Sequence, residues 1–95
     1  MSNVVSAGGT TPQVVSIRYQ VAADASPGLL PRLLQPFAKR DIVPDRLWSR
    51  RDADTLHVEF DVHELPAEYA HLIEANLRQV VGVQTITPTL AQRTI

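Results

Sequence analysis

Strict alternation of apolar and polar residues over positions 53–63, ADTLHVEFDVH, is the feature that most constrains the fold. The apolar members that would share one face are Leu56, Val58, Phe60 and Val62. The polar members that would share the other face are His57, Glu59, Asp61 and His63. A period of two is that of a β-strand with one buried face. Residues 14–21, VVSIRYQV, alternate in the same way, so two half-buried strands are predicted.

Helical spacing replaces this alternation in two other segments. In residues 27–40 the predicted apolar stripe consists of Leu30, Leu33, Leu34 and Phe37. In residues 65–82 it consists of Tyr69, Leu72, Ile73, Leu77 and Val80. Pro66 suits a first helical turn, and Gly82 suits the residue that follows a helix. Both segments are therefore predicted to be amphipathic helices.

Two further strands complete the pattern. Residues 42–51 are extended, with Pro44 typical of an edge strand, and residues 83–89 are rich in β-branched side chains. Asp52-Ala53-Asp54 is a natural hairpin turn. The resulting order, β-α-β-β-α-β, favours an α+β ferredoxin-like sandwich. In this fold a four-stranded antiparallel sheet carries both helices on one face.

Three prolines, at positions 27, 31 and 36, bear on where the first helix begins. We expect Ser26 to be its N-cap and Pro27 its first residue, where the missing N–H costs little. Pro31 and Pro36 each remove an internal hydrogen bond. Both would lie on the flanks of the buried stripe, where the vacated carbonyls can be hydrated. The helix should therefore form with a bend. The alternative is a helix that begins only near Leu30.

Composition and charge exclude several classes of function. The net charge is −1 and the isoelectric point about 6.2, which argues against nucleic acid or an anionic membrane as a partner. There is no cysteine, which excludes disulfides and thiolate metal sites. The sequence shows no export signal and no membrane-spanning apolar run, so we expect a soluble, cytoplasmic protein. Residues 13–90 would form the domain, between flexible tails at 1–12 and 91–95.

No pattern of residues points to catalysis or to a resident metal or cofactor. A nucleophile and a base cannot be paired, so we do not expect an enzyme. His57 with Glu59, or Asp61 with His63, could form a weak two-residue metal site on the polar strand face. A solvated polar face is the preferred interpretation of these residues.

Short motifs give the chain a resemblance to a known family. Ser26-Pro27-Gly28-Leu29-Leu30 opens the first helix directly after a strand. Lys39-Arg40-Asp41-Ile42 leads from that helix into the next strand, and residues 77–83, LRQVVGV, lead from the second helix into the last strand. Together with the central hairpin, these motifs resemble those of the ACT domain over residues 13–90. As a single domain, the chain looks most like the small regulatory subunit of acetohydroxyacid synthase.

The resemblance implies a ligand site at the first strand-to-helix loop, because ACT domains bind amino acids there, often across a dimer interface. Backbone N–H groups of a first helical turn attract a carboxylate, and a glycine lets ligand atoms approach the backbone. The candidate ligand-binding residues are Asp24, Ser26, Gly28, Leu29 and Leu30. Family members that bind amino acids usually carry Asp or Asn at the position of Ala25. A plain turn at Pro27-Gly28 is the alternative.

The single tryptophan, Trp48, would point to the open face of the sheet between Arg46 and Arg50, and these three residues are a candidate interface. The arginines could pair with Glu59 and Asp61 across the hairpin. A tryptophan partly covered by its arginine neighbours is the alternative. The outward positions of the strands at 14–21 and 53–63 lack the stacking aromatics of an RNA-binding sheet.

The hypothesis favoured by the sequence is a regulatory, amino-acid-sensing domain. It would act as a homodimer on a partner protein, such as the catalytic subunit of an enzyme. The alternative is an interaction or dimerisation module that keeps the fold without a ligand, and Ala25 motivates it.

Overall fold

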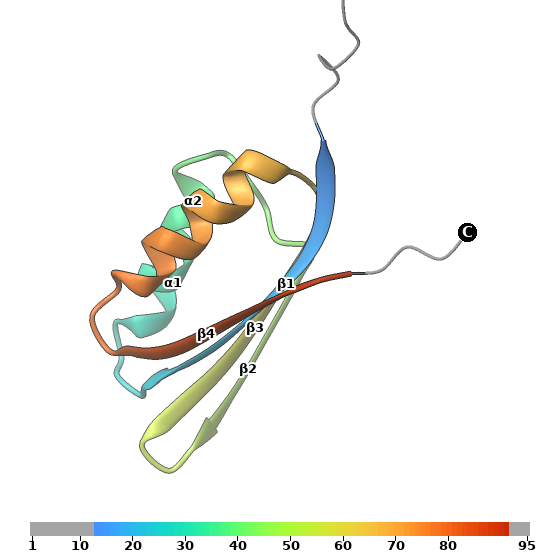
Figure 1. Cartoon of the computed structure of the whole chain (residues 1–95). Helices are drawn as coiled ribbons and strands as arrows, with labels where there is room; N and C mark the ends of the chain where they lie inside the picture. The colour runs from blue at the N-terminus through green and yellow to red at the C-terminus, as the bar shows by residue number, and fades with distance from the viewer. Residues whose placement is uncertain (1–12, 92–95) are drawn as a thin grey trace, which may run out of the picture.

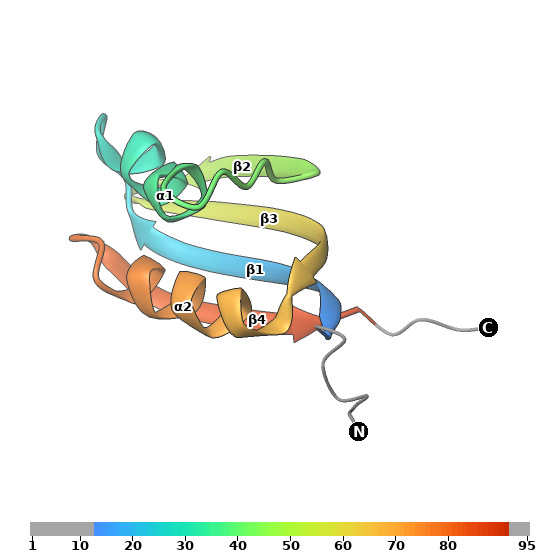
Figure 2. The same ribbon diagram turned by 90° about the horizontal axis from the view of Figure 1, so that it is seen from above.

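The computed structural model describes residues 13–91 and has the expected order of elements, β1(Val14–Asp24), α1(Leu29–Ala38), β2(Arg46–Asp52), β3(Thr55–Pro66), α2(Ala67–Arg78) and β4(Val83–Leu90). The strands form one antiparallel sheet in the order β2-β3-β1-β4. Both helices cover the same face of the sheet (Figures 1 and 2). The predicted ferredoxin-like fold is confirmed. The tails predicted at 1–12 and 92–95 lie outside the described residues.

The core lies between the helices and the inward faces of β1 and β3, as the alternation predicts. Its largest fully buried side chains include Tyr19, Phe37 and Phe60. The ring centroids of Phe37 and Phe60 are 4.8 Å apart. The Tyr19 hydroxyl donates a 2.7 Å hydrogen bond to the carbonyl oxygen of Ala70 in α2. Burial raises the pKa of this phenol, and the hydrogen bond satisfies its only donor.

The first helix begins later than the preferred prediction, and closer to the alternative start near Leu30. Gly28 is its N-cap and Leu29 its first residue, so Ser26 and Pro27 precede it. The reason is local, because the N–H of Leu29 donates to the carbonyl of Ser26 and closes a turn before the helix starts. Pro31 is thus the third helical residue, where an N–H has no helical acceptor.

The buried stripe of α1 is also rotated relative to the prediction. Leu29 and Leu33 are fully buried, whereas Leu30 and Leu34 are only partly buried. Pro36 faces the core, so the prediction that it lies on an exposed flank was wrong. Its apolar ring contributes to the core.

A β-bulge lengthens β3 and delays the second helix. Between β1 and β3 the register shifts at Val15 and Ile17, and Glu64 has a positive φ of 55°. Leu65 is therefore buried as a strand residue opposite Val15, and α2 begins at Ala67. The predicted helix start at residue 65 was two residues early.

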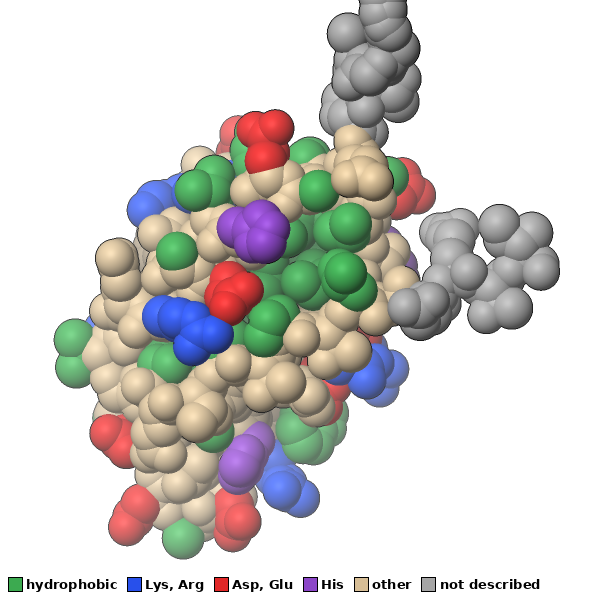
Figure 3. Space-filling model, in the orientation of Figure 1, with side chains coloured by type: hydrophobic (Ala, Val, Ile, Leu, Met, Phe, Trp, Pro, Cys, Tyr) green, Lys and Arg blue, Asp and Glu red, His purple; other side chains and the backbone are tan. Residues whose placement is uncertain are grey.

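The second helix ends earlier than predicted, with Gln79 as its C-cap. Gly82 has a φ of 100° but belongs to the turn that leads into β4. Leu72 is 46% exposed, and Ala70 takes its predicted place in the core. In the view of Figure 3, hydrophobic side chains gather on the surface over α2 and β4.

The two edge strands differ in their free backbone groups. On β4, the N–H of Ala91 donates to the carbonyl of Ser16, so alternation directs the nitrogen of Pro88 to the outer edge. Proline cannot donate there, which blocks the pairing of β4 with another strand. On β2, the same alternation leaves the N–H and C=O groups of Leu47, Ser49 and Arg51 on the outer edge.

The backbone conformation of Asp41, just after the C-terminus of α1, leads to a first testable prediction. Asp41 has a φ of 56°. Its N–H donates to Ala38, and the N–H of Ile42 donates to Phe37, which is a Schellman arrangement. We expect Asp41→Gly to raise the free energy of unfolding by about 1 kcal/mol, because glycine adopts this conformation without strain. Urea denaturation measures the change. Asp54→Gly, at a residue without positive φ, should bring no such gain, and an equal gain there would contradict the explanation.

Candidate functional site

A hollow of 460 Å³ lies beside the loop between β1 and α1. The residues that line it from the loop and the first helical turn are Ala25, Ser26, Pro27 and Leu30. Arg51 and Leu56, which face each other across the β2–β3 hairpin, line it from the other side. The hollow thus has an apolar floor, a hydroxyl and a guanidinium group.

Hydrogen-bond donors at this hollow come from the backbone and from Arg51. The N–H of Leu29 is used within the loop, and Pro31 has none. Among residues 13–91, the N–H groups of Gly28 and Leu30 have no backbone partner. The Nε of Arg51 donates to the carbonyl of Ala53 at 2.9 Å, which holds the side chain at the rim. These donors suit a carboxylate.

The predicted ligand-binding residues divide into three groups. Ser26 and Leu30 line the hollow, as expected. Gly28 is adjacent, and a Cβ atom there would meet only the guanidinium of Arg32, at 3.1 Å. Asp24 and Leu29 do not line the hollow. The Asp24 carboxylate accepts a 2.6 Å hydrogen bond from Gln84 of β4, and the side chain of Leu29 is fully buried.

Arg51 and Leu56 were missed by the sequence analysis, although a signal for them existed. The two-residue turn Ala53-Asp54 pairs Asp52 with Thr55, and therefore Arg51 with Leu56. Leu56 belongs to the inward face of β3, so Arg51 must lie on the helix side of the sheet as well. Because Trp48 was expected on the open face, alternation along the strand was enough to place Arg51 on the helix side.

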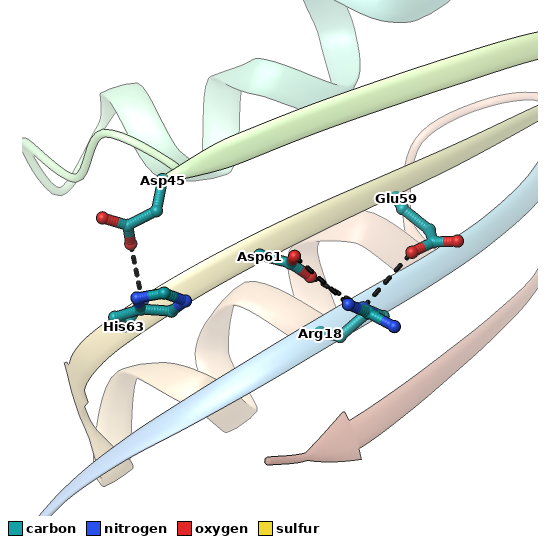
Figure 4. Close-up of polar contacts among 5 residues, drawn as sticks. All are labelled: Arg18, Asp45, Glu59, Asp61 and His63. Carbon is teal, nitrogen blue, oxygen red and sulfur yellow. Dashed lines mark hydrogen bonds and ion pairs between the residues drawn. The ribbon is translucent and has the colours of Figure 1, made fainter.

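The open face of the sheet carries Trp48 between Arg46 and Arg50, as predicted. Trp48 is 41% exposed, and the guanidinium of Arg50 lies 5.8 Å from the ring centroid of its indole. The expected pairing of these arginines with β3 was wrong. Arg18 of β1 contacts both carboxylates instead, with Nε 2.8 Å from Asp61 and 3.2 Å from Glu59 (Figure 4).

These contacts make stability depend on pH. The hydrogen bond from Arg18 lowers the pKa of Asp61 below its usual range. A depressed folded-state pKa stabilises the protein above the unfolded value of about 4, and this contribution is lost as the pH falls. Arg18→Met should therefore lower the urea midpoint at neutral pH and flatten its fall from about pH 5 to pH 3. Arg78→Met, which breaks only the helical pair with Glu74, is the matched control. An unchanged acid slope in Arg18→Met would contradict the assignment.

The histidines of β3 have no neighbouring ligand set. Among residues 13–91 there is no group of three His, Asp or Glu side chains placed to hold a metal ion. The backbone N–H of His63 donates to the carboxylate of Asp45 at 2.7 Å, which closes the end of the β2–β3 ladder (Figure 4). Neither helix in the described part of the chain is long and apolar enough to cross a membrane.

Comparison with known proteins assigns the family. Residues 10–94 match the model of the ACT-like domain family, and the chain belongs to this family. It is similar to the ACT domain from GTP pyrophosphokinase of Chlorobium tepidum, with a TM-score of 0.70 and 12% identity, covering 81% of this chain and 100% of that one. The C-terminal domain of the MgtC protein from Mycobacterium tuberculosis has a TM-score of 0.65 and 11% identity, with 82% and 88% covered. At such identity the likeness shows the fold alone. No curated protein sequence matches the chain.

Proposed function

We propose that this ACT-like domain is a regulatory module that binds a small amino-acid-like carboxylate in the hollow beside the β1–α1 loop. The observation that carries the proposal is that Arg51, Ser26 and Leu30 line one hollow of 460 Å³, beside a first helical turn whose Leu30 N–H has no backbone partner among residues 13–91. Arg51 and the backbone donors would hold the carboxylate. Leu30 and Leu56 would contact an apolar ligand side chain.

Calorimetric titration of the protein with the common amino acids tests this proposal. We expect binding by apolar amino acids, weakened by about tenfold in Arg51→Met through loss of a charge-assisted hydrogen bond. Arg78→Met is the control, because Arg78 contacts only Glu74 on α2. Absence of heat or of thermal stabilisation at millimolar concentrations would rule out the sensor.

The regulatory unit in this proposal is a homodimer formed through the free edge of β2. Placing the twofold axis at Ser49 pairs all seven residues of the strand with a second copy. Trp48 then lies opposite Arg50 of that copy, and Arg46 lies opposite Asp52. Shifting the axis by one residue places Arg46 opposite Arg50, or Arg50 opposite itself. Charge complementarity therefore supports the axis at Ser49.

Arg51 connects the two parts of the proposal. It lines the loop hollow, and in the Ser49-centred dimer it lies opposite Leu47 of the second copy. Ligand binding at Arg51 would therefore favour one dimer arrangement over others, by as much as the ligand's affinity differs between them. The partner that reads this change would be another protein. The catalytic subunit of an enzyme, in the manner of acetohydroxyacid synthase and its small subunit, is the narrower form of the proposal. The domain itself would not be catalytic.

One observation favours the alternative, an interaction module without a ligand. No carboxylate lines the loop hollow to hold an ammonium group, since Ala25 is there and Asp24 is bonded to Gln84. Ser26→Ala distinguishes the two functions, because Ser26 is exposed and lines the hollow. In a sensor, Ser26→Ala should keep stability and reduce amino-acid binding. In a module without a ligand, neither should change.

A further inference from the structure

The sheet face that the helices leave open is a regular grid of side chains. The strand registers align rows across β2, β3, β1 and β4 in turn. The first row is Arg50, His57, Ala22 and Thr85. The second is Trp48, Glu59, Gln20 and Thr87, and the third is Arg46, Asp61, Arg18 and Thr89. Ala22 alone in this grid has no side chain beyond Cβ.

The short side chain of Ala22 leaves a hollow of 390 Å³ in the grid. Trp48, Arg50 and His57 line it toward β2. Gln20, Thr85 and Thr87 line it toward β4. Glu59 also lines it, with its carboxylate 3.2 Å from the Nε of Arg18. The volume is within the range of small-molecule sites, about 300–1,000 Å³. The hollow therefore combines an exposed indole with several hydrogen-bond donors, and it lies on the opposite face of the sheet from the loop hollow.

The charges around this hollow are not balanced. Arg18 contacts the carboxylates of both Glu59 and Asp61, and the three arginines of the grid exceed its two carboxylates by one positive charge. Arg46 and Arg50 have no carboxylate within 4.0 Å among residues 13–91. Arg46 lies opposite Asp61 and helps to lower the pKa of that carboxyl, so Arg50 is the excess cation beside the hollow. This surface attracts an anion that has a flat apolar part.

We propose that the hollow over Ala22 binds a small aromatic anion, a ring that carries a carboxylate or a phosphate group. The ring packs against the indole of Trp48, which favours aromatic partners. The anionic group accepts hydrogen bonds from Arg50 and from an imidazole N–H of His57. The hydroxyls of Thr85 and Thr87 reach polar substituents on the far side of the ring. This site is separate from the proposed amino-acid site.

Nuclear magnetic resonance titration of the whole chain tests the proposal, because Trp48 is the only tryptophan and gives one indole N–H signal. Benzoate and phenyl phosphate are the probes, and the comparison between them distinguishes a carboxylate from a phosphate ligand. We expect at least one of them to shift the Trp48 indole signal and the Ala22 and Thr85 amide signals in a saturable way. Acetate, inorganic phosphate and benzyl alcohol should give weaker effects. No saturable shift with either aromatic anion would overturn the proposal, as would equal shifts with benzyl alcohol.

Two variants locate the binding. Ala22→Leu places a larger side chain in the hollow, on the open face of the sheet, and should abolish the saturable shift. Thr89→Leu adds an apolar side chain to the same face outside this hollow and is the matched control. Arg50→Met should weaken binding by about tenfold. Full affinity in Ala22→Leu or in Arg50→Met would overturn the proposal. Arg51→Met should leave this site unchanged, so failure here and failure of the amino-acid site give different results.

Discussion

Ser49→Cys is expected to form a disulfide-linked dimer on mild oxidation, because the proposed twofold axis brings the two copies of residue 49 together. The chain has no cysteine of its own, so any cross-link reports on this position. Directly opposite residues that exchange hydrogen bonds in an antiparallel pair have Cα atoms about 5.5 Å apart. A disulfide spans about 4.4–6.8 Å between Cα atoms. Gel electrophoresis without reductant measures the yield, and light scattering gives the mass of the unmodified protein.

Asp52→Cys is the matched control on the same strand. In the Ser49-centred register, the two copies of residue 52 are six residues apart along the paired strands, or about 20 Å at ~3.4 Å per residue. Asp52→Cys should therefore remain uncross-linked under the same conditions. Equal cross-linking of both variants would contradict the register. A monomeric mass for the unmodified protein would contradict the dimer itself.

Leu29→Ala should be among the most destabilising single changes in the chain. Its side chain is fully buried between α1 and the sheet, and truncation of a buried leucine costs about 2–5 kcal/mol. Leu30→Ala is the control, because Leu30 has the same size and helix propensity but is only partly buried. It should cost roughly half as much or less, since less apolar area is lost to water.

Urea denaturation of the two variants measures the difference in the free energy of unfolding. The sequence-based stripe, which included Leu30 and omitted Leu29, predicts the reverse order of effects. A larger loss for Leu30→Ala would therefore show that α1 has the rotation predicted from sequence. Far-ultraviolet circular dichroism of both variants should remain helical, because alanine favours helices as strongly as leucine does.

The strands β1 and β3 could be predicted closely because their period of two tolerates no ambiguity, whereas β2 begins at Arg46 and not at the predicted residue 42. In β3, a shift by one residue would move Phe60 to the polar face and Glu59 to the core. The helix period of 3.6 is less strict. Leucine pairs at 29–30 and 33–34 allow two apolar stripes about 100° apart, and sequence alone does not choose between them. In the structure, the stripe that includes Leu29 packs against the sheet, and Pro36 faces the core on the same side.

The candidate sites were predicted in part, for a related reason. The loop was found from Ser26-Pro27-Gly28, because its conformation depends on neighbouring residues. Its opposite wall depends on Arg51, more than 20 positions away, and could be found only by combining the hairpin register with the facing of Leu56. The hydrogen bond between Asp24 and Gln84 joins residues 60 positions apart, and no local sequence pattern predicts it.

Pro88 has a consequence for how large an assembly of this domain can grow. A dimer through β2 joins the unobstructed edges of two sheets and leaves β4 at both outer ends. Each of those ends lacks a backbone donor at Pro88, so a third copy finds no continuous ladder to extend. The proposed assembly would therefore be closed, because the same surface of both copies is used in one symmetric contact. In that dimer, Pro88 would help to prevent growth into an open-ended β-polymer.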